Sequence, residues 1–194
     1  MAMKKAASKA AGRTRAAVKK VAKKVARKVR PKAKPIPKGY HIITPSIVVR
    51  GAAEAIEFYK KAFGAKELSR MPGPEGKVLH AEIKIGDSIV MLNDEFPAMG
   101  SSSPLSIGGT ASSLLIYTRD VDELFARAVS AGAKATMPVS DMFWGDRYGR
   151  VVDPYGHHWQ LATHKEDLTP KEMAKRAAAA MSAVPPPPPQ KQQG

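Results

Sequence analysis

Hydrophobic and polar positions alternate along the middle of the chain with a period that changes from one element to the next. They alternate singly over Val78–Ile85, as in a half-buried strand, whereas apolar residues recur at spacings of three and four over Ala52–Phe63, as in a helix. Gly64 follows as the residue that ends this helix. With the intervening turn residues, the pattern predicts one strand, one helix and three further strands, at residues 42–49, 52–63, 65–70, 78–85 and 88–92.

The same order of elements recurs in the second half of the folded region. A Gly- and Ser-rich linker at residues 100–109 leads into an apolar run, and then into a helical pattern in which Val121, Leu124, Phe125 and Val129 are expected to face inward. The predicted elements are strands at 112–118, 135–139, 148–152 and 158–163 and a helix at 120–130.

This repetition predicts the fold class. We expect an α+β domain over residues 39–168, made of two βαβββ modules at residues 40–97 and 110–164. After it, the capping-box sequence that begins at Thr169 predicts a C-terminal helix at residues 169–184. The final segment, residues 185–194, opens with five prolines, which we interpret as a stiff, solvated end without an assigned partner.

Positive charge is concentrated at the N-terminus. Residues 1–38 contain 15 Lys or Arg and no Asp or Glu, whereas residues 39–194 contain 17 basic and 17 acidic residues, so the net charge of +15 belongs to the first segment alone. Like charges this dense repel one another and few large apolar side chains accompany them, so we expect a disordered basic tail. Four valines in this tail, at helical spacing, would form a narrow apolar stripe on a helix if a polyanion neutralised the charge.

The tail is expected to bind nucleic acid through its phosphates and therefore with little sequence specificity. It lacks aromatic residues that would stack on bases and Asn or Gln that would contact base edges. The residues expected to contact phosphates are Lys19, Lys20, Lys23, Lys24, Arg27, Lys28 and Arg30. An anionic membrane surface is the competing partner, but the valine stripe is thin and lacks Leu, Phe or Trp. We expect no membrane partner and a cytoplasmic, nucleoid-associated protein.

Several sequence motifs together resemble a known family. The motifs are IEFYKKAFGA at residues 56–65, HAEIKIGDSIVML at 80–92, DPYGHHWQLAT at 153–163 and ATHKEDLTPKEM at 162–173. They are similar to those of the vicinal oxygen chelate superfamily, which contains glyoxalase I, bleomycin-resistance proteins and extradiol dioxygenases, and most of all to its PhnB-type branch. The resemblance implies a half-open, curled mixed sheet, commonly completed in a homodimer. The basic tail separately resembles the Lys- and Ala-rich tails of linker histones.

Metal-dependent members of this family place one His or Glu ligand on each of four strands. Aligning the motifs puts Thr44, Met91, Ser113 and Gln160 at those positions. These side chains are poor ligands for a divalent cation, and their neighbours in the sequence are no better. The resemblance therefore predicts a member without a metal or another cofactor, in which the four positions line a ligand pocket instead.

Aromatic residues in the second module could form the walls of such a pocket. Phe143, Trp144, Tyr148 and Trp159 are candidates for flat apolar contacts, and Arg147 is a candidate for binding an anion. The alternative is that the tryptophans belong to the core and that Arg147 forms an ordinary surface ion pair. The sequence leaves both interpretations open.

His80 and Glu82 are the remaining candidates for catalysis. They are two residues apart on a predicted strand and so share one face, with His164 as a third candidate ligand. The leading hypothesis is a metal-independent domain that binds a small molecule and is tethered to DNA by its tail. The alternative is an atypical lyase or isomerase with a site around His80 and Glu82.

Overall fold

The computed structural model describes residues 33–182 of the chain. The chain divides into two units, residues 1–37 and 38–194, and the folded domain lies in the second unit. The seven basic residues assigned to nucleic-acid binding and the five prolines near the C-terminus lie outside the described residues. Among the helices that are described, none combines the length and the apolar character needed to cross a membrane.

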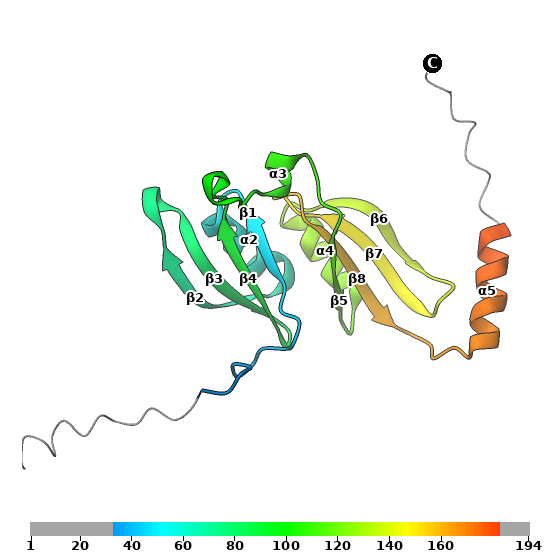
Figure 1. Cartoon of the computed structure of the whole chain (residues 1–194). Helices are drawn as coiled ribbons and strands as arrows, with labels where there is room; N and C mark the ends of the chain where they lie inside the picture. Colours follow the sequence, from blue (N-terminus) through cyan, green and yellow to red (C-terminus); the bar gives the residue numbers. More distant parts are fainter. Residues whose placement is uncertain (1–32, 183–194) are drawn as a thin grey trace, which may run out of the picture. The chain divides into compact units, whose positions relative to one another are not determined.

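The first module is a four-stranded mixed sheet with one long helix (Figure 1). Its strands lie in the order β1-β4-β3-β2, with β1 parallel to β4 and the other neighbours antiparallel. Its elements are β1 (Ser46–Val49), α2 (Ala52–Phe63), β2 (Lys66–Pro72), β3 (Val78–Ile85) and β4 (Ser88–Asp94).

The second module repeats this topology, and the expected α+β fold of two βαβββ modules is confirmed. Its strands lie in the order β5-β8-β7-β6, again with one parallel pair, β5 and β8. Its elements are β5 (Ser113–Tyr117), α4 (Val121–Ser130), β6 (Lys134–Asp141), β7 (Asp146–Val152) and β8 (His158–His164). Hydrogen bonds within the described residues form two separate sheets and not one continuous curled sheet.

Two further helices lie outside the repeated elements of the modules. α3 (Pro104–Ile107) lies in the linker, and α5 (Pro170–Ser182) follows β8 and has no buried residue. The capping box is present, since Thr169 N donates to Glu172 Oε2 at 2.9 Å and Glu172 N donates to Thr169 Oγ1 at 3.3 Å. This reciprocal pair satisfies two donors at the helix start.

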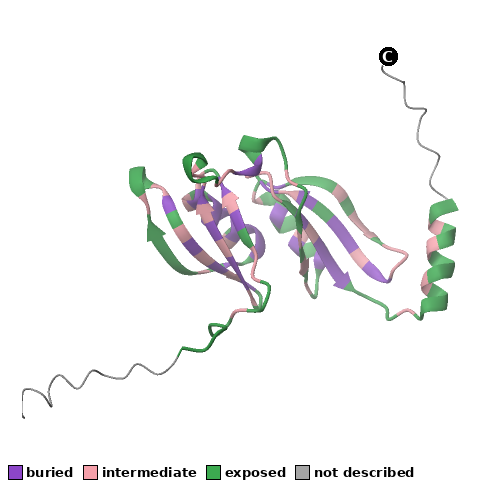
Figure 2. Ribbon diagram, viewed as in Figure 1, coloured by how far each residue is buried: buried purple, intermediate pink, exposed green. Residues whose placement is uncertain are grey.

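Buried residues occur in both modules (Figure 2). Aromatic side chains in this core hold the two modules together. Tyr59 and Phe63 on α2 contact Trp159 on β8, with ring centroids 5.6 and 4.6 Å apart. Ile56, also on α2, is fully buried. Each large apolar side chain removed from water contributes about 1.5–3 kcal/mol, so this cluster is a major part of the contact between the modules.

A buried carboxylate, Asp153, lies in the turn between β7 and β8 and is 4% exposed. Its Oδ2 accepts hydrogen bonds from Tyr59 Oη at 2.8 Å and Trp159 Nε1 at 2.9 Å. Its Oδ1 accepts from the backbone N–H groups of Tyr155 and His157, both at 2.9 Å. Burial, and then the Asp153 charge, raise the pKa of Tyr59 well above its usual value. Asp153 therefore stabilises both its own turn and the contact with the first module.

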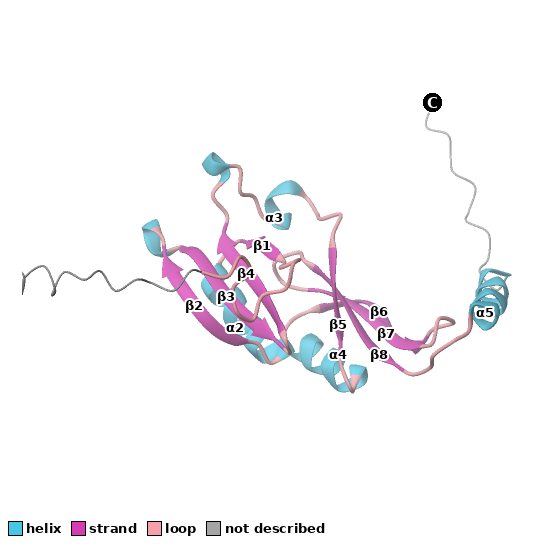
Figure 3. Cartoon of the chain, turned by 60° about the horizontal axis from the view of Figure 1, so that its bottom comes forward, coloured by secondary structure: helices cyan, strands magenta, loops and turns pink. Residues whose placement is uncertain are grey.

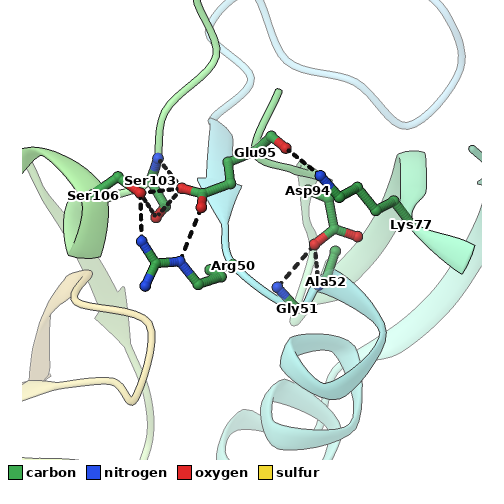
Figure 4. Close-up of polar contacts among 8 residues, drawn as sticks. All are labelled: Arg50, Gly51, Ala52, Lys77, Asp94, Glu95, Ser103 and Ser106. Carbon is green, nitrogen blue, oxygen red and sulfur yellow. Dashed lines mark hydrogen bonds and ion pairs between the residues drawn. The ribbon is translucent and has the colours of Figure 1, made fainter. Parts of the chain in front are cut away.

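The linker after β4 is fixed by a second carboxylate, Glu95 (Figure 4). Its Oε1 accepts from Arg50 Nε at 2.9 Å, and its Oε2 accepts from Ser103 Oγ at 2.7 Å and Ser106 Oγ at 2.5 Å. These hydrogen bonds, with those of Ser106 and Ser103 first, lower the pKa of Glu95 to about 2. The network ties α3 to the loop that joins β1 and α2.

The start of the first strand and the orientation of Val129 differ from expectation. The first strand begins at Ser46 and not at Ile42, because Pro45 has no N–H to donate to a ladder. Ile42 and Ile43 are consequently 90% and 83% exposed. Val129, expected to face inward, is 39% exposed near the end of α4.

Candidate functional site

The two faces of the second sheet differ. Helix α4 packs against one face (Figure 3). On this face Gly149 lies close to the ring of Phe125. Trp159 and Leu161 point to this covered side and are buried. The opposite side is here called the outer face, and strand alternation assigns to it Ser113, Leu115, Tyr117, Asp146, Tyr148, Arg150, His158, Gln160, Ala162 and His164.

The internal duplication can be checked from equivalent hydrogen bonds at the two helix starts. Asp94, near the end of β4, accepts from the N–H groups of Gly51 and Ala52. Thr163 on β8 accepts from the N–H of Val121, at the start of α4. Ala52 and Val121 are separated in the sequence by the same interval as Asp94 and Thr163. The same spacing separates Thr44 from Ser113 and Met91 from Gln160, so each of these pairs occupies equivalent positions in the two modules.

Two of these four positions are brought into contact. Gln160 Nε2 donates to Ser113 Oγ at 2.5 Å on the outer face. Thr44 lies before β1, where its hydroxyl donates to His41 O at 3.1 Å, and Met91 is half-buried in β4. Hydroxyl, thioether and amide groups do not fit a divalent cation of this family. In addition, residues 33–182 contain no group of three or more His, Cys, Asp or Glu side chains able to hold a metal ion.

The predicted aromatic wall separates into two places. Trp144 has its ring centroid 5.0 Å from Phe143 and 5.5 Å from Tyr148, so these three residues form one cluster. Trp159 is 2% exposed and belongs to the core cluster with Tyr59. Of the two interpretations of Trp159, the structure supports the core position.

Arg147 points to the covered side of β7, where its guanidinium forms ion pairs with two aspartates. Its Nε and Nη2 donate to the two oxygens of Asp122 at 2.6 and 2.7 Å, and Nη1 donates to Asp141 at 3.2 Å. These bonds, with Asp122 first, raise the pKa of Arg147 above its usual value. Arg147 forms the surface ion pairs that were the alternative to an anion-binding role.

His80 and Glu82 lie together on β3, with His80 Nε2 and Glu82 Oε1 3.3 Å apart. A hydrogen bond from Tyr40 lowers the pKa of Glu82 most, and His80 contributes less. His164, the third candidate, belongs to a different group on the second sheet. The three residues therefore do not form one site.

The group around His164 was not anticipated from the sequence. Asp146 is 6% exposed and accepts from Tyr117 Oη at 3.0 Å, Trp144 Nε1 at 3.1 Å and His164 Nδ1 at 2.7 Å. The other ring nitrogen, Nε2, lies 3.1 Å from Asp167 Oδ1. The Asp146 and then the Asp167 contacts raise the pKa of His164 above its usual value. Asp146 and His164 are paired at the ends of β7 and β8, and the sequence does not give these strand ends, so the pairing could not be predicted.

Arg150 is the second functional candidate that the sequence did not indicate. Its Nε donates to Tyr148 Oη at 2.7 Å, and its guanidinium carbon lies 5.7 Å from the centre of that ring. It borders a cavity of about 190 Å³. Among residues 33–182, no acidic side chain lies within ion-pair distance of Arg150. The cavity is lined by Thr110, Ala111, Ser112, Ser113, Thr136, Arg150, Val151, His158, Trp159 and Gln160.

A larger, mainly apolar groove of about 450 Å³ lies beside β5. Ile43 and Pro45 line it from the start of the first module, and Leu115 and Tyr117 line it from the second. Leu115 and Tyr117 are 46% and 60% exposed. The edge of β5 thus presents apolar side chains to the surface.

The comparisons with known proteins agree with this fold and these motifs. The family model for the Glyoxalase/Bleomycin resistance protein/Dioxygenase superfamily matches residues 40–161. An uncharacterized protein of Mycobacterium bovis is 46% identical over 134 residues, which cover 68% of this chain and 88% of that protein. The chain therefore belongs to the glyoxalase, bleomycin resistance and dioxygenase superfamily.

Solved structures show the same fold. TioX from Micromonospora sp. ML1 matches with a TM-score of 0.51 and 26% identity, over 66% of this chain and 100% of that chain. The PhnB protein from Bacillus cereus matches with a TM-score of 0.50 and 23% identity, over 63% and 99% of the two chains. A PhnB protein is thus among the structural neighbours, in line with the PhnB-type motifs.

Proposed function

We propose that the folded domain binds a small molecule on the outer face of the second sheet without a metal ion, and that the basic tail tethers it to nucleic acid. The observation that carries the first part is the contact between Gln160 and Ser113 beside a polar cavity. In metal-dependent relatives the equivalent positions hold ligands to the ion. Here they offer neutral hydrogen-bonding groups, which suit direct contact with an organic ligand.

Metal-independent binding can be tested with the full chain. The protein is purified, dialysed against EDTA and analysed for bound metals, and then screened against a small-molecule library by differential scanning fluorimetry. We expect compounds that raise the melting temperature equally before and after chelation, since a ligand that binds only the native state stabilises it. Stabilisation that disappears with EDTA and returns with a divalent cation would argue for a metal centre.

The second part rests on the distribution of charge. All of the excess positive charge lies in residues 1–38, and the remaining chain is neutral. Each basic side chain that pairs with a phosphate releases a counterion, so the tail can bind nucleic acid without contacts that depend on the base sequence. We propose double-stranded DNA as the partner, which would place the protein at the nucleoid.

The tail assignment is tested by comparing the full chain with a variant that begins at Gly39. Fluorescence anisotropy with a labelled duplex should show binding by the full chain only. With roughly 6–10 phosphate contacts, raising the salt concentration from about 50 to 200 mM should weaken binding by about 10³- to 10⁵-fold. Equal affinity of the two proteins would refute the tail as the binding element.

We also propose that a second copy of the chain covers the apolar edge at β5. The support is the groove of about 450 Å³ together with the exposure of Ile42, Ile43 and Tyr117. Apolar surface of this kind usually marks a contact site. Light scattering on the full chain should give the mass of a dimer, and Tyr117→Lys should shift it toward the monomer.

A catalytic role remains a second candidate, favoured by one contact. His80 and Glu82 form a hydrogen-bonded pair on the exposed side of β3, an arrangement suited to moving a proton. A lyase or isomerase at this pair would lose its activity in Glu82→Gln. Activity that persists in this variant would exclude the site.

A further inference from the structure

The geometry points to the chemical class of the ligand: an oxyanion, carboxylate or phosphoryl, held by Arg150 in the polar cavity of the second sheet. This assignment rests on the proposed small-molecule function and deepens it. Most of the residues that line this cavity are polar. Within the described part of the chain they include one guanidinium, several hydroxyl groups and an amide, and no Asp or Glu.

Arg150 is held in place while its two terminal nitrogens stay available. Its Nε donates to Tyr148 Oη at 2.7 Å, and Tyr148 is itself 5% exposed, so an exposed arginine is anchored on a buried side chain. Nη1 and Nη2 make no hydrogen bond to any of the residues 33–182. Two parallel N–H groups on one planar guanidinium match the two oxygens of a carboxylate or a phosphoryl group.

Neighbouring side chains add donors on the same side. Gln160 faces Arg150 across the β7–β8 ladder, and its amide nitrogen donates to Ser113 Oγ. Because Ser113 Oγ accepts this hydrogen bond, its own hydroxyl proton can be donated to another group. Ser113 lines the cavity, so a bound ligand could accept that proton. Thr136 supplies a further hydroxyl on β6. The site therefore offers the two terminal nitrogens of the Arg150 guanidinium and several hydroxyl donors to one anionic group.

The comparison with Arg147 shows why Arg150 is the better anion site. The two arginines are three residues apart on β7 and therefore point to opposite faces. Arg147 is neutralised by Asp122 and Asp141, whereas Arg150 has only the Tyr148 hydroxyl as a partner within the described part of the chain. An unneutralised guanidinium beside a cavity has a strong preference for anions.

The test uses the full chain labelled with ¹⁵N, because a site-specific signal separates Arg150 from the basic tail. The Nε–H resonance of Arg150 is assigned by its loss in Arg150→Lys and is followed during titration with benzoate, phenylphosphonate and the uncharged benzamide. We expect saturable shifts with the two anions and none with benzamide. The tighter of the two anions then identifies the ligand as a carboxylate or a phosphoryl compound.

Two variants complete the experiment. Arg150→Gln should weaken binding of the anions by roughly ten- to a hundredfold, the usual range for charge-assisted hydrogen bonds. Arg119→Gln, which removes the same charge from an exposed arginine after β5, should leave affinity unchanged. Amide spectra of both variants confirm that they are folded.

The outcomes separate this assignment from the proposed function. If benzamide binds as well as benzoate, or if Arg150→Gln binds the anions normally, the oxyanion assignment is wrong while small-molecule binding stands. If neither the charged nor the uncharged probes shift resonances of Ser113, Arg150 or Gln160, both the assignment and the proposed use of the outer face are refuted.

Discussion

Replacing Asp153 by Asn is expected to destabilise the domain by about 2–4 kcal/mol. The carboxylate accepts four hydrogen bonds, two on each oxygen. An asparagine retains one oxygen, and its amide nitrogen cannot accept. If that nitrogen faces Tyr59 and Trp159, the tyrosine hydroxyl can turn to accept from it, but the indole N–H loses its partner. One orphaned buried donor costs about 1–3 kcal/mol, and weakening the remaining charge-assisted bonds adds about 1 kcal/mol.

The assay is equilibrium unfolding in urea, followed by far-ultraviolet circular dichroism and by tryptophan fluorescence, to which the buried Trp159 contributes. Asp120→Asn is the matched control. Asp120 caps α4 by accepting from Glu123 N at 3.0 Å, and asparagine is as good a helix cap as aspartate. A loss below about 1 kcal/mol for Asp153→Asn, similar to the control, would show that the four hydrogen bonds do not couple the modules as argued.

Two further predictions concern ionisation. The His164 ring should titrate above its ordinary pKa of about 6.5, chiefly because of Asp146, so its contribution to stability is complete below that pH and is lost as the pH rises through the folded-state pKa. NMR titration of the ring should show this, and Asp146→Asn should lower the midpoint; a wild-type midpoint at or below 6.5 contradicts the described contacts. Glu95, with a pKa of about 2, should remain ionised in mild acid, so its contribution is present above the usual carboxyl range and is lost only as the pH falls toward 2. Glu95→Gln should accelerate proteolysis of the linker that Ser103 and Ser106 anchor, and an unchanged cleavage rate would contradict this.

Much of the fold could be predicted because each element has its own period. The helix Ala52–Phe63 was predicted with its observed bounds, and the duplicated order of elements followed from repeating patterns. The start of the first strand could not be placed in the same way. Ile42 and Ile43 have strand-like side chains, yet Pro45 interrupts the ladder, and their exposure depends on the surface around them.

The candidate site was less accessible to sequence reasoning, because which face a side chain occupies depends on exact strand bounds. The predicted strand began at Tyr148, whereas β7 begins at Asp146, so Arg147 lies inside the strand and on the covered side. No sequence motif singles out Arg150, although it alternates with Tyr148 on the outer face. Asp153 lies in one of the motifs that carry the family resemblance, but its four donors come from three parts of the chain that only the folded structure assembles.

Native mass spectrometry can show whether the domain binds a small molecule without a metal ion. The full chain is stripped with EDTA, incubated with a metabolite extract, washed and measured with and without added zinc or manganese. We expect a discrete small-molecule adduct that is the same under both conditions. An adduct that forms only after a divalent cation is restored would contradict this expectation.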